Sequence, residues 1–383
     1  QNNLMQLIYG MQDIKLLGCE QQKRWEWENI QASLFHINMS SLNLGQWQQV
    51  GAVLINEVKN ILITVLSATA VLHGNITLGV MLSIQYIIGQ MQGPISQFVS
   101  FMQATQDAKL SLERLGEIHG KPDEEIEGQH IETNLSGKDG IYLRNIEFTY
   151  GSEKSKRIIK NLSLDIPAGK TTAIVGLSGS GKTTLIKLML GFYPPTNGDV
   201  CIGERSLQKI SFKEWRKHCG VVMQEGFIFG DTIANNIAPD GEIIDKERMA
   251  YAVEMANIRD FIESLPLKYN TKIGNTGQGL SQGQKQRILI ARAIYRDPDY
   301  LFFDEATNAL DTDNEKAIQH NLDQFFKDKT VVIVAHRLST VKNANQIVVL
   351  KEGEITEKGT HEELIASRGD YYRLVKNQLE LNA

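Results

Sequence analysis

A glycine-rich segment near the middle of the chain has the residue types that bind phosphate. Residues 176–183 read Gly-Leu-Ser-Gly-Ser-Gly-Lys-Thr; they follow a short apolar run at 171–175 and precede a helical pattern. Glycines let backbone N–H groups wrap around phosphate oxygens, and the start of a helix adds its dipole. In such a loop Lys182 can reach the terminal phosphates of a nucleotide, and Thr183 can ligate Mg²⁺. The segment therefore predicts a nucleotide-binding loop between a buried strand and a helix.

Two neighbouring carboxylates follow a second apolar run. Residues 300–303 read Tyr-Leu-Phe-Phe, and Asp304 and Glu305 come directly after them. At the end of a buried strand Asp304 is placed to hold Mg²⁺ through water, and Glu305 is placed to polarise an attacking water as a general base. A strand that ends at a helix cap would have the same pattern, but the phosphate loop upstream favours the catalytic interpretation.

A second helix start with anion-binding character lies between these two motifs. Residues 279–287 read Gly-Leu-Ser-Gln-Gly-Gln-Lys-Gln-Arg and lead into a helical pattern through Tyr295. Ser281 occupies an N-cap position, and Gly283 allows a ligand to approach the backbone closely. One nucleotide does not need two such helix starts, so we expect this one to serve a nucleotide held by another copy of the chain.

The amino-terminal part of the chain is poor in charge. Between residues 29 and 106 the acidic or basic residues are Glu57 and Lys59. Two apolar stretches, 50–72 and 79–101, each have about the 20-residue length that spans a bilayer, although polar residues interrupt both. Hydropathy alone leaves a membrane hairpin and a buried helical hairpin open. Lys and Arg lie before and after the pair and are missing from the turn between, which favours a membrane hairpin with both ends in the cytosol.

Composition and charge divide the chain and limit its partners. Residues 119–140 are charged and rich in turn formers, which predicts a linker between a partial transmembrane domain at 1–118 and a nucleotide-binding domain at 141–383. A net charge of −5 gives no basic excess for binding nucleic acid. The three cysteines lie far apart, without the spacing of a disulfide framework or a metal site. Because no signal peptide opens the chain and it does not begin with Met, we expect the carboxyl part of a longer protein.

Four motifs together resemble the ATPase of ABC transporters of the exporter type. They are the phosphate loop, Leu-Ser-Gln-Gly-Gln at 280–284, Phe-Asp-Glu-Ala-Thr-Asn-Ala-Leu-Asp at 303–311 and Val-Ala-His-Arg-Leu-Ser at 334–339, in the family's order and spacing. The resemblance covers the whole chain, because the hairpin resembles the last two membrane helices of a type IV exporter and residues 2–16 resemble its coupling helix. It implies an α/β P-loop ATPase domain of the ABC type, preceded by an α-helical transmembrane hairpin.

The resemblance also implies roles for individual residues. Glu305, His336 and Gln224 would act in catalysis, and Thr183, Gln224 and Asp304 would hold Mg²⁺. Tyr150 would stack on adenine, Ser281 and Gly283 would complete the site of the opposite subunit, and Asp311 would belong to the loop that joins the two sites. Taken singly, Tyr150, Gln224 and His336 also fit structural roles. The residues expected to contact ATP are Tyr150, Gly176, Leu177, Ser178, Gly179, Ser180, Gly181, Lys182, Thr183, Thr184, Asp304, Ser281, Gly283 and Gln284.

Two positions depart from the family's pattern. Gln282 stands where the motif usually has Gly, but Ser281 and Gly283 remain, so nucleotide binding between subunits should survive. Asn275 stands where exporters usually carry Glu after the preceding Gly274. The second departure puts in doubt one polar contact between the ATPase and the membrane domain, and leaves hydrolysis untouched.

The resemblance implies an ATP-hydrolysing, homodimeric exporter subunit with ATP and Mg²⁺ as ligands. It would lie in the cytoplasmic membrane as a multi-pass protein, with the ATPase domain in the cytoplasm. Details of the motifs are similar to bacterial exporters that carry an amino-terminal cysteine peptidase, which predicts a peptide or bacteriocin-like substrate; a lipid or drug exporter is the alternative. A soluble ABC ATPase of the DNA-repair type would lack the charge-poor hairpin. A regulatory module without turnover is opposed by the presence of Glu305 and His336.

Overall fold

The computed structural model divides into two compact units, residues 1–121 and 122–383. Its described residues are 2–121, 123–124, 135–151, 156–240, 243–274, 277, 279–306, 312–335 and 341–381. The helices of the first unit are α1 (Asn2–Tyr9), α2 (Met11–Leu17), α3 (Glu20–Leu72) and α4 (Leu78–His119). The segment at 2–16, predicted as one coupling helix, forms two short helices because the chain turns at Gly10 between them.

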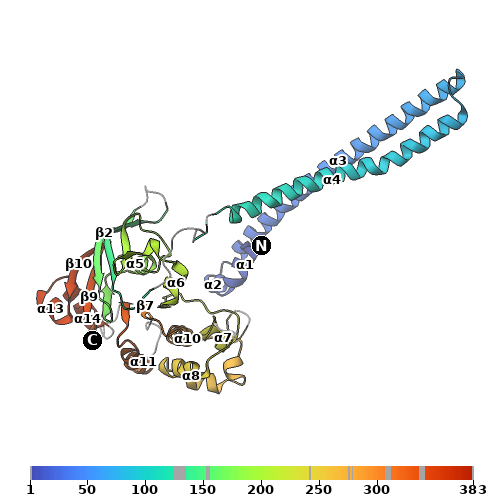
Figure 1. Cartoon of the computed structure of the whole chain (residues 1–383). Helices are drawn as coiled ribbons and strands as arrows, with labels where there is room; N and C mark the ends of the chain where they lie inside the picture. Colours follow the sequence, from blue (N-terminus) through green and yellow to red (C-terminus); the bar gives the residue numbers. More distant parts are fainter. Residues whose placement is uncertain are drawn as a thin grey trace. The chain divides into compact units, whose positions relative to one another are not determined.

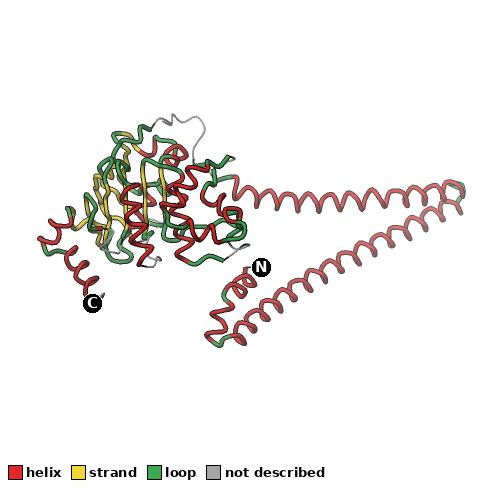
Figure 2. Tube along the Cα trace, turned by 90° about the horizontal axis from the view of Figure 1, so that it is seen from below, coloured by secondary structure: helices red, strands yellow, loops and turns green. Residues whose placement is uncertain are grey.

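Helices α3 and α4 form a long helical hairpin (Figure 1). The predicted break at 73–75 is a turn, and the hydroxyl of Thr77 caps α4 by accepting a bond from the N–H of Val80 at 3.3 Å. Both helices extend beyond the apolar stretches at 50–72 and 79–101. They leave the turn side by side and diverge away from it (Figure 2).

The apolar side chains of this hairpin remain exposed. Leu66 is 67% exposed and Phe98 65%, and among the described residues of α3 and α4 the one buried residue is Ser67. Within the described chain, α3 is the helix whose length and composition suit a membrane crossing. Glutamines lower the hydropathy of α4. The hairpin therefore does not bury its apolar surface within its own unit, and a second span at 79–101 stays a prediction.

Two sheets form the centre of the second unit. Its strands are β1 (Ile141–Thr149), β2 (Arg157–Ile166), β3 (Thr171–Val175), β4 (Asn197–Ile202), β5 (Arg205–Ser206), β6 (Cys219–Val222), β7 (Tyr300–Asp304), β8 (Thr330–Val334), β9 (Gln346–Lys351) and β10 (Glu354–Gly359). Six of them form a sheet of order β10-β9-β3-β8-β7-β6, parallel except for β10. The other four form an antiparallel sheet of order β2-β1-β4-β5.

Helices cover the parallel sheet and complete the α/β fold expected from the sequence (Figure 1). They are α5 (Lys182–Met189), η1 (Leu207–Lys209), α6 (Phe212–Lys217), α7 (Ile233–Ile237), α8 (Lys246–Met255), α9 (Arg259–Ser264), η2 (Lys268–Asn270), α10 (Gln282–Tyr295), α11 (Thr312–Phe325), α13 (His361–Ser367) and α14 (Asp370–Leu381). Helix α10 packs against α7, α8 and β6. It therefore ties the surrounding helices to the sheet.

The parallel strands separate two hydrophobic cores. Along β7, Leu301 and Phe303 enter the core shared with α7 to α11, whereas Phe302 enters the core shared with α5 and the antiparallel sheet. Val331 and Val332 of β8 divide in the same way. Successive side chains of a strand point to opposite faces, so strands that are apolar throughout must lie between two apolar layers. This double burial holds the central strands rigid.

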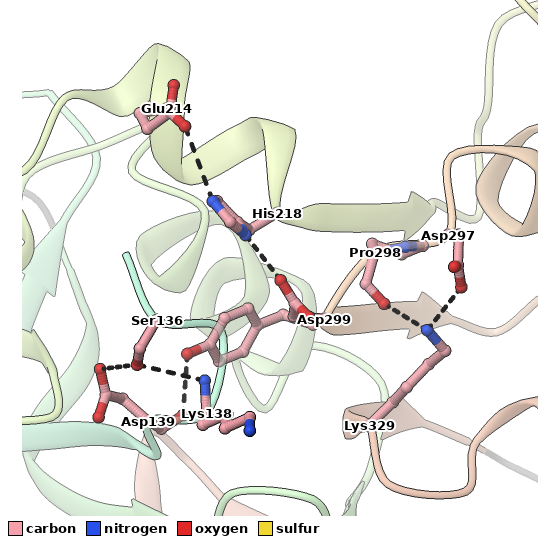
Figure 3. A network of polar contacts seen from close by, with 10 residues as sticks. Ser136, Lys138, Asp139, Glu214, His218, Asp297, Pro298, Asp299 and Lys329 are labelled. Carbon is pink, nitrogen blue, oxygen red and sulfur yellow. Dashed lines mark hydrogen bonds and ion pairs between the residues drawn. The ribbon is translucent and has the colours of Figure 1, made fainter. Parts of the chain in front are cut away.

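Polar contacts close the amino-terminal edge of the parallel sheet (Figure 3). His218, which precedes β6, places its Nδ1 atom 2.7 Å from a carboxylate oxygen of Asp299, which precedes β7. Lys329, which precedes β8, donates to Asp297 at 2.8 Å. The hydroxyl of Tyr300 donates to the backbone carbonyl of Asp139 at 2.9 Å. The phosphate loop follows the opposite end of β3, and Asp304 lies at the same end of β7.

We expect Tyr300→Phe to weaken the attachment of β1 to the parallel sheet. The side chain of Tyr300 is fully buried, so the variant loses one buried hydrogen bond and leaves the Asp139 carbonyl without this donor. The free energy of unfolding should fall by about 1 kcal/mol in chemical denaturation of the detergent-solubilised chain. Tyr251→Phe, at an exposed position, is the control and should leave it unchanged. Equal stability of both variants would contradict the role of this contact.

Candidate functional site

The glycine-rich loop connects the end of β3 to the start of α5 and has a backbone that needs glycine. Gly179 has a φ of 77° and Gly181 a φ of 104°, both in the left-handed region that other residues rarely adopt. A Cβ atom at Gly181 would lie 2.8 Å from the Cδ1 atom of Ile159. The loop therefore keeps its shape because two of its positions accept only glycine, and α5 begins directly after it at Lys182.

Lys182 is a buried cation at the start of α5. Its side chain is 6% exposed, and its ammonium donates to the backbone carbonyls of Gly176 at 2.9 Å and Leu177 at 3.0 Å. Burial lowers the pKa of Lys182, while the nearby carboxylates of Glu305 and Asp304 raise it. The ammonium is thus held at the loop by backbone carbonyls and lies near two carboxylates. A bound phosphate could pair with it in the same way as these carboxylates do.

A cavity of about 490 Å³ opens beside the loop. Its lining residues are Tyr150, Ile158, Ser178, Gly179, Gly181, Lys182, Thr183, Thr184, Gln224 and Glu305. Nine of the predicted residues, from four separate segments of the sequence, thus meet at one cavity. Ile158, from β2, was not predicted, because an apolar residue in a strand carries no signal of a ligand.

Tyr150 presents an aromatic ring at the cavity. Its hydroxyl lies 3.2 Å from the hydroxyl of Thr184, and its ring meets those of Phe148 and Tyr193 edge to face, at centroid distances of 4.8 and 5.4 Å. The ring is 39% exposed. Edge-to-face neighbours hold a ring in place and leave a face open for a planar ligand. Phe148 and Tyr193 were not predicted, since their sequence positions do not reveal that they meet Tyr150.

Asp304 ends β7 as a fully buried carboxylate. Neither of its oxygens has a hydrogen-bond partner in the described part of the chain. Burial raises its pKa; the Thr183 hydroxyl, which lies near it but outside hydrogen-bond geometry, and the Lys182 ammonium lower it. An unpaired buried carboxylate is costly unless a cation joins it. Carboxylate and hydroxyl oxygens are the donors that Mg²⁺ prefers, so Asp304 and Thr183 fit this metal.

Glu305 follows Asp304 with a strained backbone. Its φ is 51°, a left-handed conformation that costs a residue other than glycine on the order of 1–3 kcal/mol. Its N–H donates to the carbonyl of Val334 at 2.9 Å, and its carbonyl accepts a bond from the side-chain amide of Gln286 at 3.1 Å. These two bonds hold the backbone in the conformation in which the Glu305 side chain lines the cavity.

Gln224 reaches the cavity from the segment after β6. The following residues are held by Asn236, which is fully buried and bonds both the N–H and the carbonyl of Phe229, at 2.9 and 3.0 Å. Arg292 of α10 donates to the carbonyls of Phe227 at 3.0 Å and Asn236 at 2.6 Å. The loop that carries Gln224 is thus braced from α7 and α10.

The second predicted anion site does not line this cavity. Ser281 caps α10: its hydroxyl accepts from the N–H of Gln284 at 3.1 Å, and the Gln284 side chain accepts from the N–H of Ser281 at 2.9 Å. Ser281 is exposed, and none of Ser281, Gly283 and Gln284 is among the described residues that line the cavity. The helix start is therefore fully capped but contributes no described residue to the lining of this cavity.

His336, Asp311 and Asn275 lie outside the described residues. Gly176, Leu177 and Ser180 belong to the loop but do not line the cavity among the described residues. The Oγ atom of Ser180 is buried and has no hydrogen-bond partner in the described chain. The arrangement and the charges of these residues suit the binding of a polyphosphate and a divalent cation. The Glu305 carboxylate at the same cavity can take a proton.

Comparison with known proteins supports this arrangement. Residues 159–308 match the protein family described as "ABC transporter". Proteins described as "Leukotoxin translocation ATP-binding protein LktB" from Mannheimia glucosida, Mannheimia haemolytica and Bibersteinia trehalosi are each 36% identical over 379 residues, 99% of this chain and 53% of the relative. The chain thus spans about half the length of these relatives. A solved structure described as a bacterial Atm1-family ABC exporter with ATP bound superposes with a TM-score of 0.90 at 26% identity, covering 98% of this chain and 66% of that one.

We expect Asp304→Asn to stabilise the protein when no nucleotide is present. A carboxyl whose pKa is raised by folding costs stability at pH values above that pKa, and the cost disappears as falling pH protonates the folded state. The variant should therefore gain about 1–3 kcal/mol near neutral pH, and the gain should shrink in acid. Chemical denaturation across a pH series measures it. Asp323→Asn, on the outer part of α11, is the control; an equal gain there would contradict the explanation.

Proposed function

Because the chain belongs to the ABC transporters of the exporter type, we propose that it is the ATP-hydrolysing part of an exporter that moves a polypeptide across the cytoplasmic membrane. The observation that carries the proposal is the cavity at which the phosphate loop, Gln224 and Glu305 meet, with the unpaired carboxylate of Asp304 beside it. An ATPase domain of this family binds ATP. Hydrolysis, the metal, the second copy and the cargo are parts of the proposal.

The loop and its surroundings bind the nucleotide. Backbone N–H groups of the glycine-rich loop and the start of α5 face the phosphates, and the Lys182 ammonium neutralises their charge. Tyr150 offers its open face to the base, with Ile158 as an apolar neighbour. Thr183, Asp304 and Gln224 are the residues that would hold Mg²⁺, which supplies positive charge to the phosphates during transfer.

Glu305 acts as the base. Its carboxylate lines the cavity at the end of β7, and its backbone is held from both sides by Val334 and Gln286. A carboxylate at this position orients a water molecule and takes its proton as the water attacks the terminal phosphate. Lys182 stabilises the charge that develops on the phosphate oxygens.

Two copies of the chain share two nucleotides. Ser281 and Gly283 form an exposed, capped helix start that does not line the cavity of its own chain, according to the described residues. A helix start of this kind binds anions, so a second copy can place it against the nucleotide held by the first. Each complete site then contains the phosphate loop of one chain and the start of α10 from the other.

Helix α3 supports the membrane location, and the relatives support the class of cargo. The long, exposed and apolar helix α3 supports insertion into the cytoplasmic membrane, with the ATPase domain in the cytoplasm. The description of the LktB relatives names leukotoxin translocation. Since a leukotoxin is a protein, this supports a polypeptide cargo over a lipid or a drug. The match along the whole chain opposes a soluble DNA-repair ATPase.

Glu305→Gln should separate hydrolysis from binding. The variant keeps the size of the side chain but cannot take a proton, so kcat should fall by about a hundredfold or more while ATP still binds. ATP hydrolysis by the full chain in nanodiscs and binding of a fluorescent ATP analogue measure the two properties. Glu352→Gln is a matched control, because Glu352 has a similar φ of 50° but lies in an exposed turn. Unchanged hydrolysis in Glu305→Gln would remove the base from the mechanism.

Lys182→Ala should weaken ATP binding itself. Loss of a buried, charge-assisted phosphate contact should reduce the affinity for the ATP analogue by about tenfold to a hundredfold. Lys209→Ala, at an exposed position on η1, should bind as the unaltered chain does. Normal affinity in Lys182→Ala would show that the loop does not bind the phosphates in this way.

The cargo class can be tested by stimulation of hydrolysis. Transported substrates commonly raise the turnover of a coupled pump, because they favour the state that closes on ATP. We expect an unfolded polypeptide to raise kcat of the chain in nanodiscs by about twofold or more. Stimulation by a lipophilic drug or an added lipid, without any by polypeptides, would favour the lipid or drug alternative.

A further inference from the structure

Gln286 is a buried polar residue to which the sequence motifs assign no function. It lies in α10, five residues after the capping Ser281, and its side chain is 8% exposed. Its amide nitrogen donates to the backbone carbonyl of Glu305 at 3.1 Å. Buried side-chain amides need partners, and this one takes its partner at the backbone of the residue that carries the proposed base.

The Glu305 backbone depends on such bonds. A left-handed residue other than glycine keeps its conformation only where its surroundings determine it. The N–H of Glu305 is held by Val334 of β8, within the rigid sheet, and its carbonyl by Gln286 of α10. The helix bond is therefore the one that can change when α10 moves relative to the sheet.

The same helix also contacts the segment that follows Gln224. Leu289 and Arg292 follow Gln286 on α10 after three and six residues. A Cβ atom at Gly226, two residues after Gln224, would collide with the side chain of Leu289. Arg292 donates to the carbonyl of Phe227 at 3.0 Å. One rigid helix thus contacts the backbone of Glu305 and the loop of Gln224.

We propose that Gln286 is a positioning residue. Through its bond to the backbone carbonyl of Glu305 it fixes the orientation of the Glu305 carboxylate, and it makes that orientation depend on the position of the start of α10. The inference rests on the proposed function, in which that helix start binds the nucleotide of the second copy. When Ser281 binds the nucleotide of the second copy, the Glu305 carboxylate of its own chain is then aligned for catalysis. The two are linked because Ser281 and Gln286 lie less than two helical turns apart on α10.

Gln286→Met tests the proposal. Methionine keeps the length and the apolar stem of the side chain but removes the amide donor. We expect kcat of the full chain in nanodiscs to fall about tenfold, equivalent to about 1.4 kcal/mol, while KM and the affinity for a fluorescent ATP analogue change less than about twofold. Adding Glu305→Gln to the variant should lower the residual rate no further than Glu305→Gln alone, since both changes act through one carboxylate.

Asn321→Leu is the matched control. The Asn321 amide on α11 also donates to a backbone carbonyl, that of Met255 at 3.1 Å, and it does not line the cavity. This variant should lose a similar amount of stability and keep kcat. If Gln286→Met does not fold, as judged from its thermal unfolding, Gln286→Glu keeps the volume and places an acceptor against the Glu305 carbonyl, and the same fall in kcat is expected.

The outcomes separate the two proposals. Unchanged kcat in the Gln286 variants, or an equal fall in Asn321→Leu, overturns the positioning role when Glu305→Gln still lowers kcat about a hundredfold or more. A fall in kcat that comes with an equal rise in KM also overturns it, because it would indicate general disruption of the site. Full hydrolysis in Glu305→Gln would instead overturn the assignment of the base, and with it the proposed function of this cavity.

Discussion

The parallel, in-register pairing of β3, β8 and β7 sets the positions of the phosphate loop and of the two carboxylates, on which the rest of the site depends. Ile174 pairs with Val334, and Val334 pairs with Asp304, so the three strands end at one level of the sheet. At this level the phosphate loop follows β3, Asp304 ends β7, and Glu305 follows it. Both faces of these strands are buried, and a strand held between two cores cannot slip without moving its side chains out of them. The sheet thus holds groups that are more than a hundred residues apart in the sequence within one cavity.

This arrangement places two charged groups, Asp304 and Lys182, largely out of contact with bulk water. Asp304 is fully buried without a hydrogen-bond partner among the described residues, and Lys182 is nearly buried between loop carbonyls and two carboxylates. Such groups oppose folding when they stand alone and favour a ligand that brings phosphate and a cation. The left-handed backbone of Glu305 adds strain at the same edge. A nucleotide with its cation would therefore gain most of its binding energy from these groups, whose charges lack full partners when no nucleotide is bound.

Helix α10 connects the proposed anion site at Ser281, the backbone of Glu305 and the loop that carries Gln224, which the sheet does not connect. Its capped start is exposed, its middle bonds the backbone of Glu305, and its last turns brace the loop that carries Gln224. Two copies that exchange these helix starts would share both nucleotides, and the helix would carry the state of one site to the other.

Local patterns in the sequence determined the phosphate loop, the strands at 171–175 and 300–304, the turn at 73–75 and the cap at Ser281, because glycine content, apolar runs and capping residues act over a few neighbouring positions. The tertiary structure alone decided which distant residues meet. Ile158 at the cavity, Phe148 and Tyr193 beside Tyr150, and Gln286 at the backbone of Glu305 look like ordinary strand, loop and helix residues in the sequence. Their roles depend on strand order and helix packing, which arise from contacts between segments far apart in the chain and leave no local signal.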